Sequence, residues 1–323
     1  MSIDKNTHLT EVLKTHKMSH VEDFKNRVQA RADEIKDKLS EHYGTNKYVV
    51  FNSGSMAKHT ATNIKFDMDF IEPFKRNAFD TLQDMFDDVY NFLHKEYKED
   101  DDLAEEVRRQ KVSIGVKFRQ EEGDDKPIEI DVTPGRELNA DEYPNTHDLN
   151  LCFNEDAWGF KKNSYQKTNI KKQIDHISGK QEERKIIRLL KIWKNHNNKP
   201  YKSFMLELIT IKALESYKGA NALWNKLKYT MEYIRDNIYE DSFHLYDPGN
   251  SNNDVVSSME KTRRYDLKNE METMLNNIEN NDEYLKIYFP INEQFKEEDK
   301  DDSFGNKTGR EGYSSPSTSQ RFG

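Results

Sequence analysis

The spacing of apolar residues changes along the chain, from a mixed pattern in roughly the first 150 residues to a helical one after them. Apolar residues recur every three or four positions over 21–42 and 78–96, which predicts two amphipathic helices. Alternation of apolar and polar residues, or a short apolar run, predicts strands over 48–51, 65–74, 112–119 and 128–133. The first part of the chain is therefore predicted to mix helices and strands.

Individual residues predict where these elements begin and end. Ser19 and Glu22 match a capping box at the start of the first helix, and Gly44 is expected to end it. The Pro-Gly pair at 134–135 is expected to close the last strand. The acidic run 98–106 is interpreted as an exposed connection.

Beyond residue 161 the apolar period is that of helices. They are expected over 183–196, 203–217, 221–238 and 255–278. The end of the chain is acidic and then rich in Gly, Ser and Thr, which is typical of a flexible tail. We therefore expect a core domain over 1–160, a helical domain over 161–295 and a tail over 296–323.

Composition excludes several classes of protein. The chain has 323 residues, of which 34% are charged and 11% aromatic, so a substantial core is expected and wholesale disorder is not. One cysteine, Cys152, excludes an internal disulfide and a cysteine-based zinc site. The sequence shows no signal peptide and no membrane span. We expect a soluble cytoplasmic protein without a membrane partner.

Charge is distributed unevenly. The net charge is −9, yet residues 161–199 hold twelve Lys and Arg against three acids. A local basic segment in an acidic protein suits a compact polyanion such as a nucleoside triphosphate. The alternative is a solvated helix face balanced by acidic neighbours.

Two carboxylates interrupt an apolar segment in the predicted strand 65–74. Asp67 and Asp69 are two positions apart, so on a strand they share one face while Met68 and its apolar neighbours pack behind them. Asp131 lies on the polar face of the strand 128–133. If the two strands are neighbours, three carboxylates converge, which suits a hard cation such as Mg²⁺. Alone, the first pair could equally be an exposed acidic face.

A Gly-Ser turn precedes these carboxylates. Gly54 lets the backbone approach an anion closely, and the Ser55 hydroxyl and nearby N–H groups can donate to phosphate oxygens. A phosphate site beside a carboxylate-bound cation suits phosphoryl or nucleotidyl transfer, in which two metals about 3.5–4 Å apart hold the attacking and leaving oxygens. An ordinary turn is the alternative.

Together, the Gly-Ser turn, the Asp-x-Asp pair and the later Asp resemble the nucleotidyltransferases of the DNA polymerase β-like superfamily. The long helix 21–42 is similar to the spine helix of the cGAS/DncV-like nucleotidyltransferases, the bacterial CD-NTases. The segment 188–209 resembles the part of that family in which a helix lysine and a later serine hold the donor triphosphate. The resemblance covers about residues 18–290 and is placed nearest the E clade, whose members include cyclic UMP-AMP synthases.

The resemblance implies a fold and a reaction. The fold would be an α+β polymerase β-like sheet with an N-terminal spine helix, packed against a C-terminal helical bundle. The reaction would join nucleoside triphosphates, ATP with UTP or GTP, into a cyclic di- or trinucleotide messenger of bacterial anti-phage signalling (CBASS), releasing pyrophosphate. A pyrimidine-containing product such as cyclic UMP-AMP would follow from the clade.

The resemblance also implies a role for each site residue. Two Mg²⁺ ions, or Mn²⁺ in their place, would bind to the three aspartates, with Asp131 nearest the acceptor hydroxyl. Lys191 and Ser203 would hold the donor triphosphate opposite the Gly-Ser turn, and Phe204 would stack on a base. The Asn163 amide could read a uracil edge, or it could be a surface turn residue.

The sequence also bears on which partners the protein is expected to bind. It has no Cys/His cluster and no broad basic surface, so we expect a monomer that needs no nucleic-acid activator. The chain ends in Gly323, which is compatible with a partner resembling ubiquitin-conjugating enzymes that joins this terminus to a target. A flexible tail that happens to end in glycine is the alternative.

Two other functions compete with this hypothesis. A template-free RNA or oligoadenylate nucleotidyltransferase would need a broad basic groove, which the sequence does not predict. A non-catalytic nucleotide-binding antitoxin predicts a broken metal triad, whereas all three candidate aspartates are present.

Overall fold

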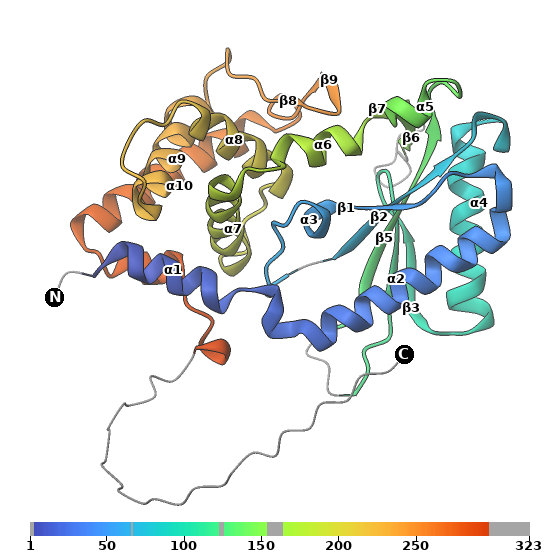
Figure 1. Ribbon diagram of the computed structural model, residues 1–323. Coiled ribbons are helices and arrows are strands. Elements are labelled where there is room, and N and C mark those ends of the chain that lie inside the picture. Colours follow the sequence, from blue (N-terminus) through green and yellow to red (C-terminus); the bar gives the residue numbers. More distant parts are fainter. Residues whose placement is uncertain (1–2, 66, 123–125, 154–163, 297–323) are drawn as a thin grey trace, which may run out of the picture.

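A seven-stranded mixed sheet forms one half of the molecule, and a group of helices packs beside it (Figure 1). The computed structural model describes residues 3–65, 67–122, 126–153 and 164–296. The strands of this sheet are β1 (Phe51–Ser53), β2 (Met68–Phe74), β3 (Ala104–Arg109), β4 (Ile114–Phe118), β5 (Glu129–Glu137), β6 (Leu149–Phe153) and β7 (Ser164–Thr168).

The helices fall into two groups along the chain. Those of the sheet half are α2 (Glu22–Tyr43), the short α3 (Gly54–Ala57), α4 (Leu82–His94) and the short α5 (Tyr143–Thr146). The others are α1 (Lys5–Thr15), α6 (Ile170–Ile177), α7 (Gln181–His196), α8 (Ser203–Glu215), α9 (Leu223–Asn237), α10 (Lys261–Asn280) and α11 (Tyr284–Tyr288).

The order of the strands brings the segments that carry the aspartates together. The order is β1-β2-β5-β4-β3, with β6 pairing to the end of β5 and β7 pairing to β6. β2 and β5 are parallel, whereas β1 is antiparallel to β2 and β4 is antiparallel to β5. The parallel register places Asp69 directly beside Asp131. The neighbouring strands that the three-carboxylate hypothesis required are therefore present.

α2 and α4 cover the sheet through their apolar stripes. Val28, Ile35 and Leu39 of α2 share one buried cluster with Met68 and Phe70 of β2. These two β2 residues alternate with the aspartates, as the sequence pattern predicted. α2 confirms the predicted long helix, and Gly44 caps its end at φ +52°.

The start of α2 differs from the prediction. Ser19 belongs to a 3₁₀ turn, Met18–Val21, and the helix begins at Glu22 with no side-chain cap. The predicted capping box is therefore wrong, because the chain arrives in a helical turn rather than in the extended conformation that the motif needs.

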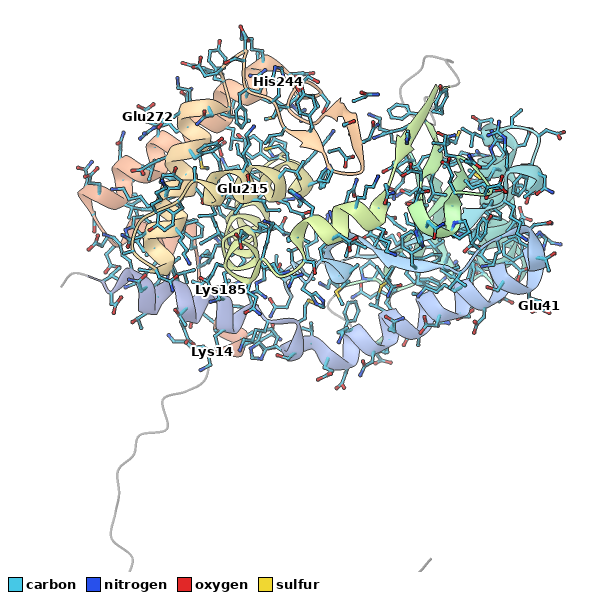
Figure 2. All side chains as sticks on the ribbon, turned by 45° about the horizontal axis from the view of Figure 1, so that its top comes forward. Lys14, Glu41, Lys185, Glu215, His244 and Glu272 are labelled. Carbon is cyan, nitrogen blue, oxygen red and sulfur yellow. The ribbon has the colours of Figure 1, made fainter. Side chains whose placement is uncertain are left out.

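A second buried cluster lies in the helical half. Leu9 and Val12 of α1 pack there with residues of α7, α8, α9 and α10. The sequence pattern did not predict α1. Its apolar stripe is short, and it is buried by helices far along the chain. α1 and α2 follow one another along one edge of the molecule, with Lys14 near the end of α1 and Glu41 near the end of α2 (Figure 2). The domain boundary near residue 160 stays a prediction.

Several strand predictions need correction. β3 occupies the end of the run 98–106, because Val107 faces the core while the charged residues around it face solvent. β5 continues through Pro134 and Gly135 to Glu137, where its outer end pairs with β6.

In the described part of the chain no helix is both long and apolar enough to cross a membrane.

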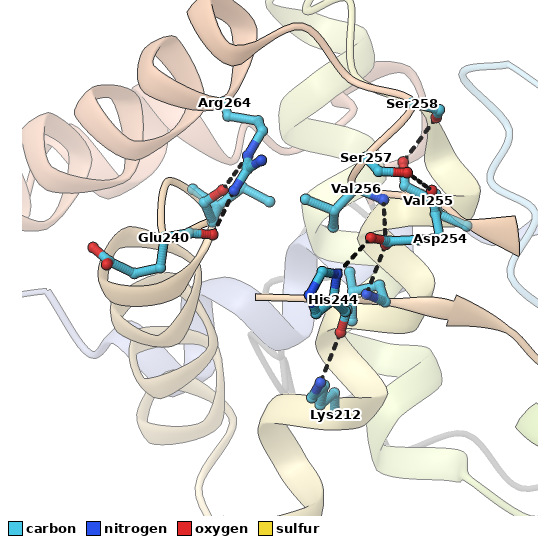
Figure 3. A network of polar contacts seen from close by, with 11 residues as sticks. Lys212, Glu240, His244, Asp254, Val255, Val256, Ser257, Ser258 and Arg264 are labelled. Carbon is cyan, nitrogen blue, oxygen red and sulfur yellow. Dashed lines mark hydrogen bonds and ion pairs between the residues drawn. The ribbon is translucent and has the colours of Figure 1, made fainter. Parts of the chain in front are cut away.

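A polar network holds the hairpin of β8 (Tyr246–Asp247) and β9 (Asn250–Asp254) on the helices (Figure 3). Asp254 Oδ2 lies 2.7 Å from His244 Nδ1, and its other oxygen accepts the N–H groups of Leu245 and Val256. Lys212 on α8 donates to the His244 carbonyl at 2.8 Å. These groups satisfy one another, so we assign the network a structural role.

His59 provides a test of backbone strain beside the Gly-Ser turn. It is exposed and has a φ of 57°, where a Cβ is unfavourable. We expect His59→Gly to raise the free energy of unfolding by about 1 kcal/mol. Urea unfolding checks this, with Ala30→Gly on the exposed face of α2 as a control that should lose about 1 kcal/mol. A loss of stability in His59→Gly would contradict the strain argument.

Candidate active site

The Gly-Ser turn lies against Asp69, at the start of β2. Gly54 begins α3 at φ +62°, and a Cβ built on it would lie 1.8 Å from Asp69 Oδ2. The antiparallel register explains this approach, because Ser53 pairs with Asp69. Only glycine fits at position 54, because any side chain there would collide with the carboxylate.

Burial and neighbouring carboxylates raise the proton affinity of Asp69 and Asp131. Burial, then the charges of Asp131 and Asp67, raise the pKa of Asp69 to about 7. Burial, then the charge of Asp67, raise the pKa of Asp131 to about 6. The Gln110 amide donates to Asp131 Oδ1 at 2.8 Å and partly offsets this rise. The strands thus hold carboxylates where, with no cation bound, their negative charge is unfavourable.

These pKa shifts predict how stability depends on pH when no cation is bound. Between about pH 4 and 7 the folded protein binds more protons at Asp69 than the unfolded chain, so the free energy of unfolding falls as pH rises. We expect Asp69→Asn to gain little at pH 4 and about 4 kcal/mol over wild type at pH 8. Urea unfolding in EDTA measures the difference, and a gain independent of pH would contradict the assignment.

Two lysines of α7 face the aspartates. Lys191 Nζ donates to the carbonyl of Thr60 at 2.8 Å, and Lys194 Nζ donates to Ser203 Oγ at 2.9 Å. Burial, then the nearby Lys194, lower the pKa of Lys191 to about 8. Burial and the charge of Lys65 lower the pKa of Lys194. An anion between these ammonium groups would remove their mutual repulsion.

A cavity of about 320 Å³ joins these groups. Among its lining residues are seven candidates named from the sequence: Gly54, Ser55, Asp67, Asp69, Lys191, Ser203 and Phe204. Asp131 lies beside Asp69 on β5 but does not line the cavity. Asn163 and Gly323 lie outside the described residues.

The cavity has further lining residues that sequence reasoning missed. They are Lys58, Thr60, Lys65, Lys194, Asn195 and Glu207. Two of them carry a signal in the sequence. Lys194 follows Lys191 by one helical turn, and Glu207 is a charged residue inside the apolar run of α8. The same kind of interruption had singled out Asp67 and Asp69.

A second cavity, of about 490 Å³, adjoins the first. Lys65, Asp67, Lys194 and Asn195 line both. The basic segment 161–199 contributes less to this site than its charge suggested. Of its described Lys and Arg residues, Lys191 and Lys194 line the first cavity, whereas others pair with acids elsewhere, such as Lys172 with Asp148 and Lys185 with Glu182.

Comparison with known proteins bears on the fold. No protein-family model matches the chain, and no curated protein matches its sequence. Solved structures do match. Escherichia coli MS115-1 CdnC with ATP superposes with a TM-score of 0.66 at 18% identity, over 88% of this chain and 95% of CdnC. The Bradyrhizobium diazoefficiens CD-NTase CdnG with GTP gives 0.65 at 12%, over 89% and 96%.

This chain has the CD-NTase fold. A third match is the Vibrio cholerae cyclic AMP-GMP synthase DncV, described as a prokaryotic cGAS homolog. It has a TM-score of 0.59 at 14% identity, over 75% of this chain and 68% of DncV. The predicted α+β polymerase β-like fold, with α2 as the spine helix, is confirmed. These matches span differently named CD-NTases, so the E clade stays a prediction.

Proposed function

We propose that this protein is a metal-dependent nucleotidyltransferase that joins nucleoside triphosphates into a cyclic di- or trinucleotide and releases pyrophosphate. One observation carries the proposal. In a CD-NTase fold, a single cavity brings the Gly-Ser turn and two carboxylates of the sheet together with lysines and a serine of the helical half. Both walls of a triphosphate site are thus supplied by segments far apart in the sequence.

The donor triphosphate would lie between the two walls. Ser55 and the N–H groups after it would donate to its oxygens from the sheet side. Lys191 and Lys194 would neutralise it from α7, and Ser203 would orient it. Burial lowers the pKa of both lysines, and a neighbouring cation adds to this, Lys194 for Lys191 and Lys65 for Lys194. Buried cations placed this close together support an anionic ligand here.

The donor atoms fit a hard cation. Among the described residues, no group of three or more His, Cys, Asp or Glu side chains is placed so that it could hold a metal ion unaided. Mg²⁺ commonly binds one or two carboxylates and completes its shell with water and substrate phosphates. Asp67 and Asp69 would hold two Mg²⁺ ions, or Mn²⁺, together with the triphosphate, and Asp131 would complete the second site. Bound there, these ions would stabilise negative charge on the reacting oxygens.

The residues define the chemical step. An acceptor ribose hydroxyl near Asp131 would lose its proton to that carboxylate. The hydroxyl oxygen would form a bond to the donor α-phosphorus while the bond to the β-phosphate oxygen breaks. Lys191 and Lys194 would stabilise the departing pyrophosphate. A second, intramolecular round would close the ring.

Substrate choice and cellular role belong to the same proposal. Phe204 lines the cavity and would stack on a base, and Asn163 would read a uracil edge. Substrates would be ATP with UTP or GTP, and the product would include a pyrimidine, as in cyclic UMP-AMP. The messenger would act in bacterial anti-phage signalling (CBASS). The protein would be a cytoplasmic monomer, with Gly323 offered to a conjugating partner.

Product analysis tests the proposal. The purified protein is incubated with ATP, UTP, GTP, CTP and Mg²⁺, and products are treated with phosphatase and resolved by mass spectrometry. A phosphatase-resistant cyclic product supports the proposal. Linear extension of added RNA would favour an RNA nucleotidyltransferase, and nucleotide binding without any product would favour a regulatory protein.

A further inference from the structure

A buried ion pair joins the two walls of the cavity. Lys58 Nζ lies 2.8 Å from Glu207 Oε1, and the two side chains are only 7% and 6% exposed. Lys58 follows α3 on the sheet side, whereas Glu207 lies on α8, 149 residues further along the chain. The pair therefore connects the phosphate-side turn to the helical half.

Lys58 has further contacts inside the cavity. Its ammonium lies 4.4 Å from the centre of the Phe204 ring, within cation–π range. Burial raises the pKa of Asp69, and the charge of Lys58 acts against that rise. The ammonium is thus held close to Glu207, Phe204 and Asp69 at once.

Glu207 is unexpected in a site built for an anion. Asp67 and Asp69 have a use as cation ligands, but Glu207 lies on the opposite wall, among lysines. A buried ammonium is unfavourable without a partner, and a carboxylate at hydrogen-bond distance keeps it charged and fixed. The Lys58 ammonium has three N–H donors and uses one of them on Glu207, so others can donate to a ligand.

We propose that Lys58 is a phosphate-positioning residue and that Glu207 holds it in place. Lys58 would donate to an oxygen of the triphosphate while remaining paired with Glu207, adding a third cation to Lys191 and Lys194 from the opposite wall. The identity of the ligand rests on the proposed function. The alternative is a purely structural ion pair that only ties α3 to α8.

Charge reversal separates these roles. We would measure binding of inorganic tripolyphosphate by calorimetry, together with melting temperature, in wild type, Lys58→Met, Lys58→Arg and the double variant Lys58→Glu with Glu207→Lys. Lys58→Met should weaken binding by about 10-fold or more, as expected for losing a charge-assisted hydrogen bond. Lys58→Arg should bind within roughly threefold of wild type, because it keeps the charge and the partner.

The reversed pair should regain most of the melting temperature lost by Lys58→Met but keep the weakened binding, because its cation now extends from α8. Restored binding in the reversed pair, or unchanged binding in Lys58→Met, would overturn the proposal. If Lys58→Met does not fold, the reversed pair still decides. Lys228→Met, from the half-exposed pair with Glu232 on α9, is the matched control and should leave binding unchanged.

The outcome is separable from that of the proposed function, because tripolyphosphate binding needs no turnover. If wild type makes no nucleotide product yet binds tripolyphosphate through Lys58, the proposed function fails and this inference stands. If product forms while Lys58→Met keeps the wild-type KM for the donor nucleotide and the wild-type affinity for tripolyphosphate, this inference fails and the proposed function stands.

Discussion

Replacing the carboxylates just before and within β2, in the double variant Asp67→Asn with Asp69→Asn, is expected to reduce product formation by more than about 10³-fold. The substitutions keep the shape of the side chains but remove the charge that would bind the catalytic cations. The buried position of Asp69 beside Asp131 supports this expectation, because such carboxylates are unfavourable unless a cation binds them. Rates with NTP mixtures and Mg²⁺ measure the effect.

Stability separates this loss from misfolding. Removing repelling carboxylates should leave the metal-free variant as stable as wild type or more so at pH 8. Mg²⁺ should raise the melting temperature of wild type in the presence of nucleotide, but not that of the variant. Asp241→Asn, at an exposed surface pair with Lys261, is the control and should keep full activity. An active double variant would refute the metal assignment.

Gly54→Ala is expected to damage both stability and activity. The new Cβ would lie 1.8 Å from Asp69 Oδ2 and would also be held at φ +62°. Either the turn or the carboxylate must move, at an expected cost of about 2–3 kcal/mol in the free energy of unfolding. A displaced Asp69 should lower product formation by about 10²-fold, since small misplacements at a reacting centre have effects of this size.

Gly179→Ala is the matched control for Gly54→Ala. Gly179 has a similar φ of +75°, but nothing lies within 4 Å of the Cβ it would gain. It should lose only about 1 kcal/mol, for the left-handed backbone, and keep its activity. Denaturant unfolding and product assays on both variants separate the collision with Asp69 from backbone strain. Equal losses in the two variants would show that the close approach does not matter.

Local pattern was sufficient where a segment's environment follows from its own residues. The stripe of α2 and the alternation in β2 predicted both elements, because burial on one face leaves a period in the sequence. The period did not predict α1 or β3. α1 packs its short stripe on α7 and α9, and β3 offers few apolar positions between charged ones. The boundary error at Pro134 has a similar origin, because pairing with β2 and β6 extends β5 past the local Pro-Gly signal.

The candidate site divides in the same way. Asp67, Asp69 and Gly54 could be named from the sequence because charged or flexible residues inside an apolar segment are conspicuous. Lys58 and Glu207 could not be paired, since nothing in either segment indicates that they meet across 149 residues. Their contact exists only once α8 packs beside the turn.

By itself the sequence determined the residue types of the proposed phosphate and cation site, the strand at which two of its carboxylates lie, and the α+β class of the fold. Each can be predicted from a short segment, because the period of apolar side chains and the backbone freedom of glycine are local properties. The tertiary structure decided which lysines face that strand, how close Gly54 comes to Asp69, and that a buried Lys58–Glu207 pair connects the two walls of the cavity. These contacts depend on strand register and helix packing, which bring together segments whose own sequences do not indicate that they meet.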